Sequence, residues 1–472
     1  MLSAGVARVD ITPPLPIDLV GYSRRAAPAT GVRRPLTATA LVFGSDETRA
    51  AIVAIDVPFL VPADADRIRA DIGREIAAPA ENVMLSVSHT HAGPTTHATG
   101  VKIGGDQRGR SANEMAFIGY LPAQLVSVAG RAARELEPVR VAGGSGSLDL
   151  AINRRQKNAE GRMILGWNPD KPVDRDVGVL RVDRLDGTTL AVVANYACHP
   201  VVVGPEDPAV NPDFPGRMRE VVEEATGATC LFIMGACGNL LPLEGFFDHP
   251  GPEEAFGRKL GIEVLHVLES LEPVTREVRQ ISYGSVTPIT LQRREPVDPQ
   301  PDQPLVVASR SVELPLKRVP DLSELEEERD GYQRQLDEAK AAGADQVAWN
   351  PIEYHLNWAN DAIDQVKNGV ATPEVPAFLQ AMRVGETVIA TMPGEAFSEL
   401  AIEVKDRSPA TTTLFAAYTN GVLSYLPTAE EYPHGGYECD YAHHSYGLVE
   451  QIAPESERIL VETSVDLVTD TF

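Results

Sequence analysis

Two histidines stand at the end of an apolar run, in the motif Ser88-His89-Thr90-His91. Alternate side chains of a β-strand point to the same face, so His89 and His91 could reach one reacting centre at the strand end. The turn-forming residues 92–94 (Ala-Gly-Pro) follow at once, which suits a site at this position. Neutral imidazole is the commonest metal ligand near pH 7, although two histidines could also cap a loop for structural reasons alone.

A third histidine ends another predicted strand. The apolar run 189–197 leads directly to His199, which precedes a proline. One such histidine would usually be structural, but two strand-end histidine motifs in one chain favour a metal site. Glu395 lies between a predicted strand and a predicted helix. It is either an anionic metal ligand or a first-turn carboxylate that the helix dipole stabilises.

Two further segments contain residue types that are typical of functional sites. The loop of residues 419–447 holds Tyr425, Tyr437 and several other tyrosines and histidines. Exposed loops rarely need so many aromatic side chains for packing, and they often carry binding and catalytic groups. Residues 235–242 follow a buried strand and contain two glycines, which allow the backbone to approach a ligand closely.

Strands and helices alternate along the chain, which indicates an α/β or mixed α+β protein. Period-2 apolar runs predict strands, and apolar residues at helical spacing predict helices. The predicted strands are 6–11, 36–43, 49–55, 83–87, 139–152, 177–183, 189–197, 230–234, 377–392 and 413–418. The predicted helices are 63–77, 114–135, 216–226, 321–342, 352–368, 396–405 and 455–468. The two helices near 320–370 predict a helical hairpin packed on the main body, with a lid or a dimerisation arm as the alternative.

The composition limits the kinds of partner. The formal net charge is −25, and a strongly acidic chain repels nucleic acid and anionic membrane surfaces. No run approaches 18 apolar residues, and the first residues lack the basic and apolar regions of a signal peptide. We therefore expect a cytoplasmic protein with a small-molecule substrate, no nucleic-acid partner and no stable membrane association. The sequence is compatible with a homo-oligomer and does not fix the oligomeric state.

Several well-known enzyme motifs are absent from the sequence. There is no GxSxG nucleophile elbow, no Walker A sequence, no GxGxxG after a strand and no HExxH. These absences disfavour a serine hydrolase of the α/β-hydrolase type, a P-loop nucleotidase and a Rossmann oxidoreductase.

Taken together, these motifs resemble the catalytic N-terminal domain of the neutral/alkaline non-lysosomal ceramidases and their bacterial relatives. The matching segments, in chain order, are 5–13, 21–23, 89–94, 152–154, 199, 235–242, 393–395 and 425–438. The resemblance is loose between about 245 and 375. It implies an α/β fold of mixed β-sheets flanked by helices, a single catalytic domain over residues 1–472, and a helical insertion at about 320–370.

The resemblance also implies a ligand set and a mechanism. One zinc ion per chain would be held by four residues, namely His89, His199, Glu395 and Tyr425. His91 would lie beside the metal and transfer a proton, and Arg154 and Tyr437 would stabilise an oxyanion. Zinc lowers the pKa of a bound water to roughly 7, so hydroxide would be available to attack the carbonyl of an amide.

Three departures from the family pattern disfavour ceramide as the substrate. Leu241 stands where the ceramidases have a serine, the C-terminal β-sandwich of the ceramidases is not expected here, and no export signal is visible. We therefore predict a zinc-dependent hydrolase that cleaves the C–N bond of a small soluble amide. The alternatives are an esterase, lactonase or glycoside-cleaving enzyme at the same site, or a non-catalytic metal-binding homologue.

Overall fold

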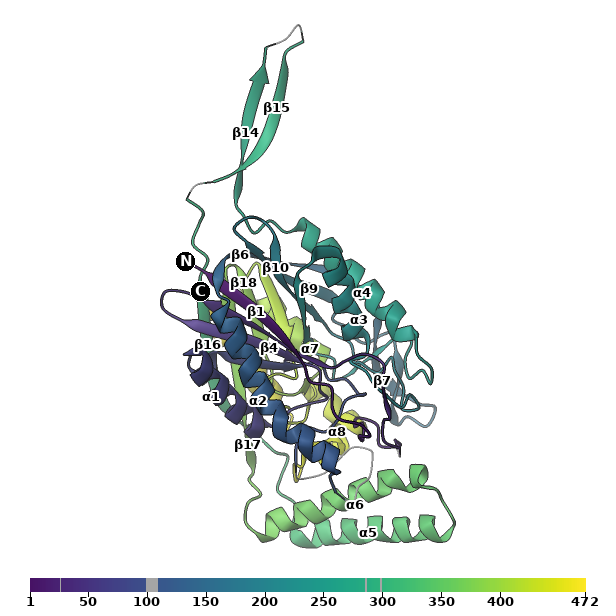
Figure 1. Ribbon diagram of the computed structural model, residues 1–472. Coiled ribbons are helices and arrows are strands. Elements are labelled where there is room, and N and C mark those ends of the chain that lie inside the picture. The colour runs from purple at the N-terminus through teal and green to yellow at the C-terminus, as the bar shows by residue number, and fades with distance from the viewer. Residues whose placement is uncertain (26, 99–108, 285–286, 298) are drawn as a thin grey trace.

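An eight-stranded sheet forms the centre of the fold (Figure 1). The computed structural model describes residues 1–25, 27–98, 109–284, 287–297 and 299–472. In spatial order, the strands of this sheet are β12 (Thr229–Met234), β10 (Thr189–Tyr196), β9 (Asp176–Arg184), β6 (Glu137–Ser147), β1 (Ser3–Asp10), β3 (Thr37–Gly44), β4 (Arg49–Ile55) and β5 (Val83–Val87). The outermost pairs at the two edges, β10–β12 and β4–β5, are parallel, whereas the other pairs are antiparallel.

A four-stranded sheet packs against one face of the central sheet. Its order is β16 (Leu305–Pro315), β17 (Glu374–Val384), β18 (Thr387–Thr391) and β20 (Thr412–Ala416), and β18 and β20 are parallel. Fully buried side chains from both sheets, among them Leu41, Val182, Ile389 and Leu414, form one hydrophobic core. Burial of this apolar surface is the main force that holds the two sheets together.

Helices cover the outer faces of both sheets, so the layers follow an α/β/β/α order. The central sheet is covered by α1 (Pro62–Ile76), α2 (Ala112–Arg134), α3 (Phe214–Thr226) and α4 (Pro252–Ser270), and the smaller sheet by α7 (Ser398–Arg407) and α9 (Ser456–Thr469). A capping box begins α2, where Ser111 and Glu114 each accept a hydrogen bond from the other's backbone N–H. The predicted class, mixed β-sheets flanked by helices, is confirmed.

Several short elements lie outside these layers. The short strands are β2 (Gly31–Val32), β11 (Ala209–Val210), β7 (Ala151–Lys157), β8 (Met163–Asn168), β13 (Leu240–Pro242), β19 (Glu395–Ala396) and β21 (Tyr425–Leu426). The short helices are η1 (Ala80–Asn82), η2 (Ala429–His434), α8 (Tyr437–Asp440) and η3 (Ala442–Tyr446). The last three helices, together with β21, occupy the segment 419–447 that the sequence predicts as a loop. Within the described residues, no helix has both the length and the apolar character needed to span a bilayer.

Two predicted strands are each divided in the structure. The predicted strand 377–392 is the antiparallel pair β17–β18, because Gly385 adopts a φ of 63° and turns the chain. The predicted strand 139–152 is β6 followed by the start of β7. The projecting ribbon of β14 (Arg276–Tyr283) and β15 (Ile289–Pro296), which extends from one end of the body in Figure 1, is absent from the predictions.

The predicted helical hairpin is present as α5 (Leu322–Ala341) and α6 (Gln346–Lys367), at the end of the body opposite the β14–β15 ribbon (Figure 1). Its attachment to η3 is polar and aromatic. The Trp358 indole N–H donates to the Leu448 carbonyl at 2.8 Å, and the Trp358 ring stacks on His444. His355 and His444 share a hydrogen bond between their Nδ1 atoms at 2.9 Å. The hairpin is therefore docked on the body through two uncharged imidazoles, the buried His444 and the half-buried His355.

This docking predicts that the protein loses stability as the pH falls. Burial is the main cause that lowers the pKa of His444, and the neighbouring His443 and His355 lower it further. Burial also lowers the pKa of His443 to about 3. Below a pH of about 6.5 these histidines bind protons in the unfolded chain, whereas in the folded protein they stay neutral. The free energy of unfolding therefore falls as the pH drops below that value. Each such histidine should lower the free energy of unfolding by about 1.4 kcal/mol between pH 7.5 and pH 5.5.

Urea denaturation of a His444→Phe variant at the two pH values tests this prediction. Phenylalanine preserves the stack on Trp358, and the variant should lose about 1.4 kcal/mol less than the wild type over this pH interval. His249→Gln, at an exposed histidine beside Asp248, is the control. An unchanged pH dependence in His444→Phe would contradict the prediction.

Candidate metal centre and active site

His89 is placed by the strand β5 and by a strained backbone conformation. The strand ends at Val87, and His89 follows it with a φ of 58°, in the left-handed region that non-glycine residues rarely adopt. The Nδ1 atom of His89 lies 2.6 Å from the Pro58 carbonyl oxygen. The sequence analysis attributes the proximity of His89 and His91 to the alternation of side chains along a strand. This explanation is wrong, because both residues lie beyond the end of β5. The left-handed residue brings the two side chains together instead.

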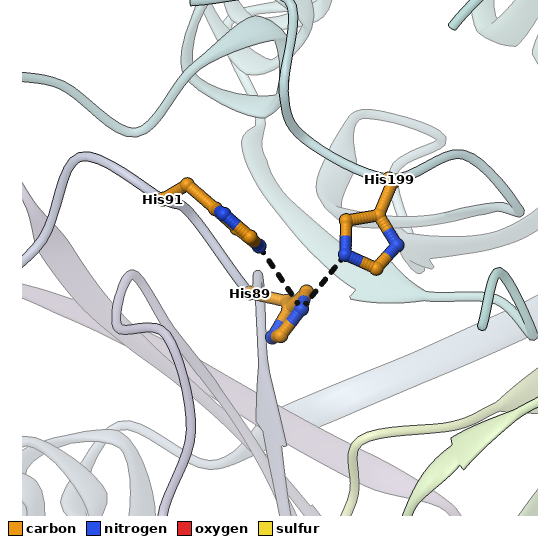
Figure 2. A group of neighbouring side chains, drawn as sticks. All are labelled: His89, His91 and His199. Carbon is orange, nitrogen blue, oxygen red and sulfur yellow. Dashed lines mark hydrogen bonds between the residues drawn. The ribbon is translucent and has the colours of Figure 1, made fainter. Parts of the chain in front are cut away.

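His199 follows β10 and approaches His89 from the other edge of the central sheet. Its Nδ1 atom lies 3.1 Å from the Cys237 carbonyl oxygen, in the glycine-containing turn after β12. The Nε2 atoms of His199 and His89 are 3.1 Å apart, and those of His91 and His89 are 3.3 Å apart. Figure 2 shows the three imidazoles converging on one point. All three histidines thus form one group, in which His89 and His199 are buried and His91 is half-buried.

The chemistry of this group fits a bound cation. A carbonyl oxygen can only accept, so His89 and His199 must each carry the proton on Nδ1 and a lone pair on Nε2. Two lone pairs that face each other at 3.1 Å repel, and a metal ion between them would remove the repulsion. Nitrogen ligands of a tetrahedral zinc ion lie about 3.3 Å apart, given Zn–N bonds of roughly 2.0–2.1 Å. The observed spacings of 3.1 and 3.3 Å are close to this value.

Protonation is the other way to relieve this repulsion, and burial opposes it. Burial lowers the pKa of His89, and Arg154 lowers it further, against the opposing effect of Glu395. The pKa values of His91 and His199 lie well below the ordinary histidine value, first because of burial and then because of the neighbouring His89. The three imidazoles are thus neutral near pH 7, which is the form that binds metals.

Glu395 and Tyr425 lie side by side at the same centre. They are Cα partners in the short parallel pair β19–β21, so a backbone bridge positions both side chains. The Glu395 Oε2 atom is 3.5 Å from His89 Nε2 and 3.8 Å from His199 Nε2. Tyr425 is buried, and burial followed by the nearby Glu395 raises the pKa of its hydroxyl well above 10. The structure thus brings the predicted residues together from strands that are far apart in the sequence.

Two tyrosines that sequence reasoning missed hold the Glu395 carboxylate. The hydroxyl of Tyr418 donates to Glu395 Oε2 at 3.1 Å, and the hydroxyl of Tyr446 donates to Oε1. Tyr418 also accepts a hydrogen bond from Cys237 Sγ at 3.2 Å, and its ring lies 4.4 Å from that of His89. Tyr446 belongs to the tyrosine-rich segment that the sequence indicates. Tyr418 stands at the end of a predicted strand and has no motif of its own.

Arg154 and Tyr437 lie on the other side of the centre. The Arg154 guanidinium is buried; its Nε donates to Glu438 Oε1 at 2.7 Å, and its Cζ lies 5.4 Å from the Tyr425 ring centroid. Its Nη2 atom makes no hydrogen bond to a described residue that meets normal geometry. Burial raises the pKa of Tyr437 to about 12, so this hydroxyl is a donor at neutral pH. Both residues can therefore offer hydrogen bonds to a bound molecule.

A cavity of about 500 Å³ opens on these groups. Its inner wall is formed by five of the predicted site residues, which are His91, Arg154, His199, Tyr425 and Tyr437. Leu241, at the position where a serine is expected, lines the cavity and packs with Ile152 and Val201. The helix α6 contributes Tyr354 and His355 to the opposite wall. A cavity of this size accommodates a small organic molecule.

Comparison with known structures shows which fold this chain shares. The fold is similar to that of neutral ceramidase from Pseudomonas aeruginosa, with a TM-score of 0.65 and 19% sequence identity over 99% of this chain and 74% of that chain. A solved structure of a ceramidase complexed with C2 matches equally well, with a TM-score of 0.65 and 18% identity over the same shares of the two chains. This chain therefore has the fold of the neutral ceramidases.

The sequence also matches a family model over part of its length. Residues 2–233 match the model of the family described as neutral/alkaline non-lysosomal ceramidase, N-terminal. The comparison with curated proteins found no match. Over these residues the chain is similar to the neutral/alkaline ceramidases, as its motifs predict.

The contacts of Tyr418 predict a role in metal retention. Removal of its hydroxyl in Tyr418→Phe leaves Glu395 Oε2 without that donor, and the loss of such an outer-shell partner typically weakens metal binding 10- to 100-fold. Competition with a chelator, followed by metal analysis, measures the change. Tyr120→Phe, which removes a hydroxyl bonded to the Ile11 and Thr12 carbonyls, is the matched control. Equal metal affinity in Tyr418→Phe and the wild type would contradict the assignment.

Proposed function

We propose that this protein is a zinc-dependent hydrolase that binds one zinc ion per chain and cleaves the amide bond of a small soluble substrate. The observation that supports this proposal best is the convergence of three neutral imidazoles, two buried and one half-buried, beside a cavity for a small molecule. The similarity of residues 2–233 to the ceramidase family model supports hydrolysis of an amide in particular, because ceramidases cleave one.

The proposed zinc ligands are His89, His199, Glu395 and Tyr425. Two imidazole nitrogens and a carboxylate oxygen are ordinary ligands of catalytic zinc, and a tyrosine oxygen adds a fourth. Zinc, when bound at such a site, supplies a water of pKa near 7 and polarises a carbonyl oxygen. The Nδ1 hydrogen bonds of His89 and His199 fix the tautomer and ring orientation that ligation needs.

The remaining site residues would act on the substrate. His91, neutral and on the cavity wall, would accept the proton that the attacking water loses and pass it to the leaving nitrogen. Arg154 is held by Glu438, and its free Nη2 would donate to the carbonyl oxygen as negative charge develops. Tyr437 would donate a second hydrogen bond, and each such donor is typically worth about 3–4 kcal/mol of transition-state stabilisation.

A second role for His91 deserves a test, because its Nε2 atom is as close to His89 as a third metal ligand would be. In that case His91→Ala would lower metal affinity and activity together. If His91 transfers a proton, His91→Ala would retain the metal and lose turnover. Metal analysis of this one variant separates the two roles.

The substrate is proposed to be smaller and more soluble than ceramide. Leu241 cannot donate a hydrogen bond, and its side chain makes part of the cavity wall apolar. The net charge of −25 opposes approach to an anionic membrane surface. A single catalytic domain, a cytoplasmic location and the state of association stay predictions.

The metal content of protein purified without added metal tests the central proposal. We expect about one zinc ion per chain in the wild type, and loss of zinc in His89→Ala and in His199→Ala, because each removes one imidazole nitrogen. His266→Ala, at a histidine of α4 outside the site, is the control. A folded wild-type protein without a tightly bound transition metal would refute the metal-dependent mechanism.

A substrate panel then distinguishes the reactions. Amides, esters, lactones and glycosides of small acids and alcohols are incubated with the zinc-loaded protein. Faster turnover of amides supports the proposal, whereas turnover of esters, lactones or glycosides alone would assign the alternative hydrolase. Stoichiometric zinc without any turnover would support a non-catalytic metal-binding protein.

A further inference from the structure

The charges that line the cavity are unlike those of the whole protein. The chain carries 67 acidic and 42 basic residues. Among the described residues, nineteen line the cavity, and none of them is an aspartate or a glutamate. Two of them are arginines, Arg24 and Arg154. A cavity with a positive lining in an acidic protein attracts negatively charged ligands and repels cations.

Arg24 and Arg154 differ in what neutralises them. Arg154 is paired with the buried Glu438 at 2.7 Å. Arg24 is exposed, and no ion pair or hydrogen bond joins its side chain to a described residue. Its guanidinium is therefore available to a ligand in the cavity. Guanidinium groups bind carboxylates with two parallel hydrogen bonds, which also orients the bound molecule.

A second buried cation strengthens the positive character of this wall. Arg25 donates from Nη1 to the His91 carbonyl at 2.7 Å, and its guanidinium carbon lies 5.1 Å from the Tyr22 ring centroid. Burial lowers the pKa of Arg25 to about 10, so it still carries its charge at neutral pH. Arg25 acts in turn on the cavity, where it contributes to the lowered pKa of His91.

The position of Arg24 relates it to the reacting end of the cavity. Tyr22, Ser23 and Arg24 are consecutive and all line the cavity. The Tyr22 ring lies 4.9 Å from His91 and 6.1 Å from Phe246, between the metal centre and an apolar wall. That wall also includes Val201 and Leu241. One ligand can thus reach the metal centre, an apolar surface and a free arginine at once.

We infer that Arg24 binds a carboxylate of the substrate, and that the substrates are amides that carry both an apolar acyl chain and a carboxylate, such as N-acyl amino acids. This inference rests on the proposed function for the amide bond alone. The binding of the carboxylate depends only on the cavity and on Arg24.

Calorimetric titration with a pair of non-cleavable ligands tests the inference. N-octylsulfonylglycine carries the carboxylate, and N-octylsulfonylglycinamide is its neutral counterpart; hydrolases of amides do not cleave the sulfonamide. The wild type should bind the anion at least about ten times more tightly than the neutral ligand, and salt should weaken only the binding of the anion. Arg24→Gln should reduce this preference to less than about twofold.

Arg258→Gln is the matched control, because it removes the same charge from an exposed position of α4 that does not line the cavity. The control should retain the wild-type preference. Equal binding of the two ligands to the wild type, a retained preference in Arg24→Gln, or failure of both ligands to bind at millimolar concentration would overturn the inference.

Release of octanoate from N-octanoylglycine is measured separately. Tight, Arg24-dependent binding of the anion without release of octanoate would support the inference and contradict the proposed function. Release of octanoate at equal kcat/KM from N-octanoylglycine and N-octanoylglycinamide would support the proposed function and overturn the inference.

Discussion

Two unprotonated imidazole nitrogens face each other at 3.1 Å in the interior of this protein, and much of the surrounding structure serves to keep them there. The carbonyl oxygens of Pro58 and Cys237 fix the proton of each ring on the far side. Burial prevents relief by protonation, since it lowers the pKa of both histidines. An arrangement that is repulsive when empty becomes stabilising when it holds a cation, so the free energy of metal binding is linked to the stability of the fold.

The two-sheet architecture explains how residues so distant in sequence meet. His89, His199, Cys237 and Glu395 all follow the carboxyl ends of strands, namely β5, β10, β12 and β18. β5 and β12 are opposite edges of the central sheet, yet they lie in contact, and β20 packs beside β12. The carboxyl ends of parallel strands are a common place for ligand sites in α/β proteins, and here both edges and the second sheet supply such ends to one centre.

The sequence predicts those parts of the site that have local signals. Each histidine ends an apolar run and precedes a turn, so its placement at a strand end could be predicted without knowledge of the fold. The left-handed backbone conformation of His89 could not be predicted, because it arises from tertiary contacts and not from the residue type. The same holds for Tyr418, whose contacts with Glu395 and Cys237 join segments that no sequence pattern connects.

Several helices and strands of the structure were not predicted from the sequence, and their surroundings explain why. The ribbon β14–β15 alternates polar and apolar residues but is exposed along much of its length, so its pattern does not reflect burial against a core. The helix α4 lies in the region where the family resemblance is loose, and it was not predicted although its buried residues Phe256, Leu260 and Val264 have helical spacing. The hairpin α5–α6 was predictable because its apolar spacing is regular, whereas its polar docking through His355 and His444 was not.

The residues around the cavity differ in how strongly their neighbours constrain them. The residues nearest the centre are held by buried hydrogen bonds, such as that of Arg154 with Glu438, and a change in any of them leaves a buried group without a partner. Leu241 and Arg24 are under no such constraint, since one packs against apolar neighbours and the other faces open space. Substitutions at such positions alter the polarity and charge of the walls at little cost to stability. The walls of the cavity can therefore change while the group of His89, His91 and His199 stays the same.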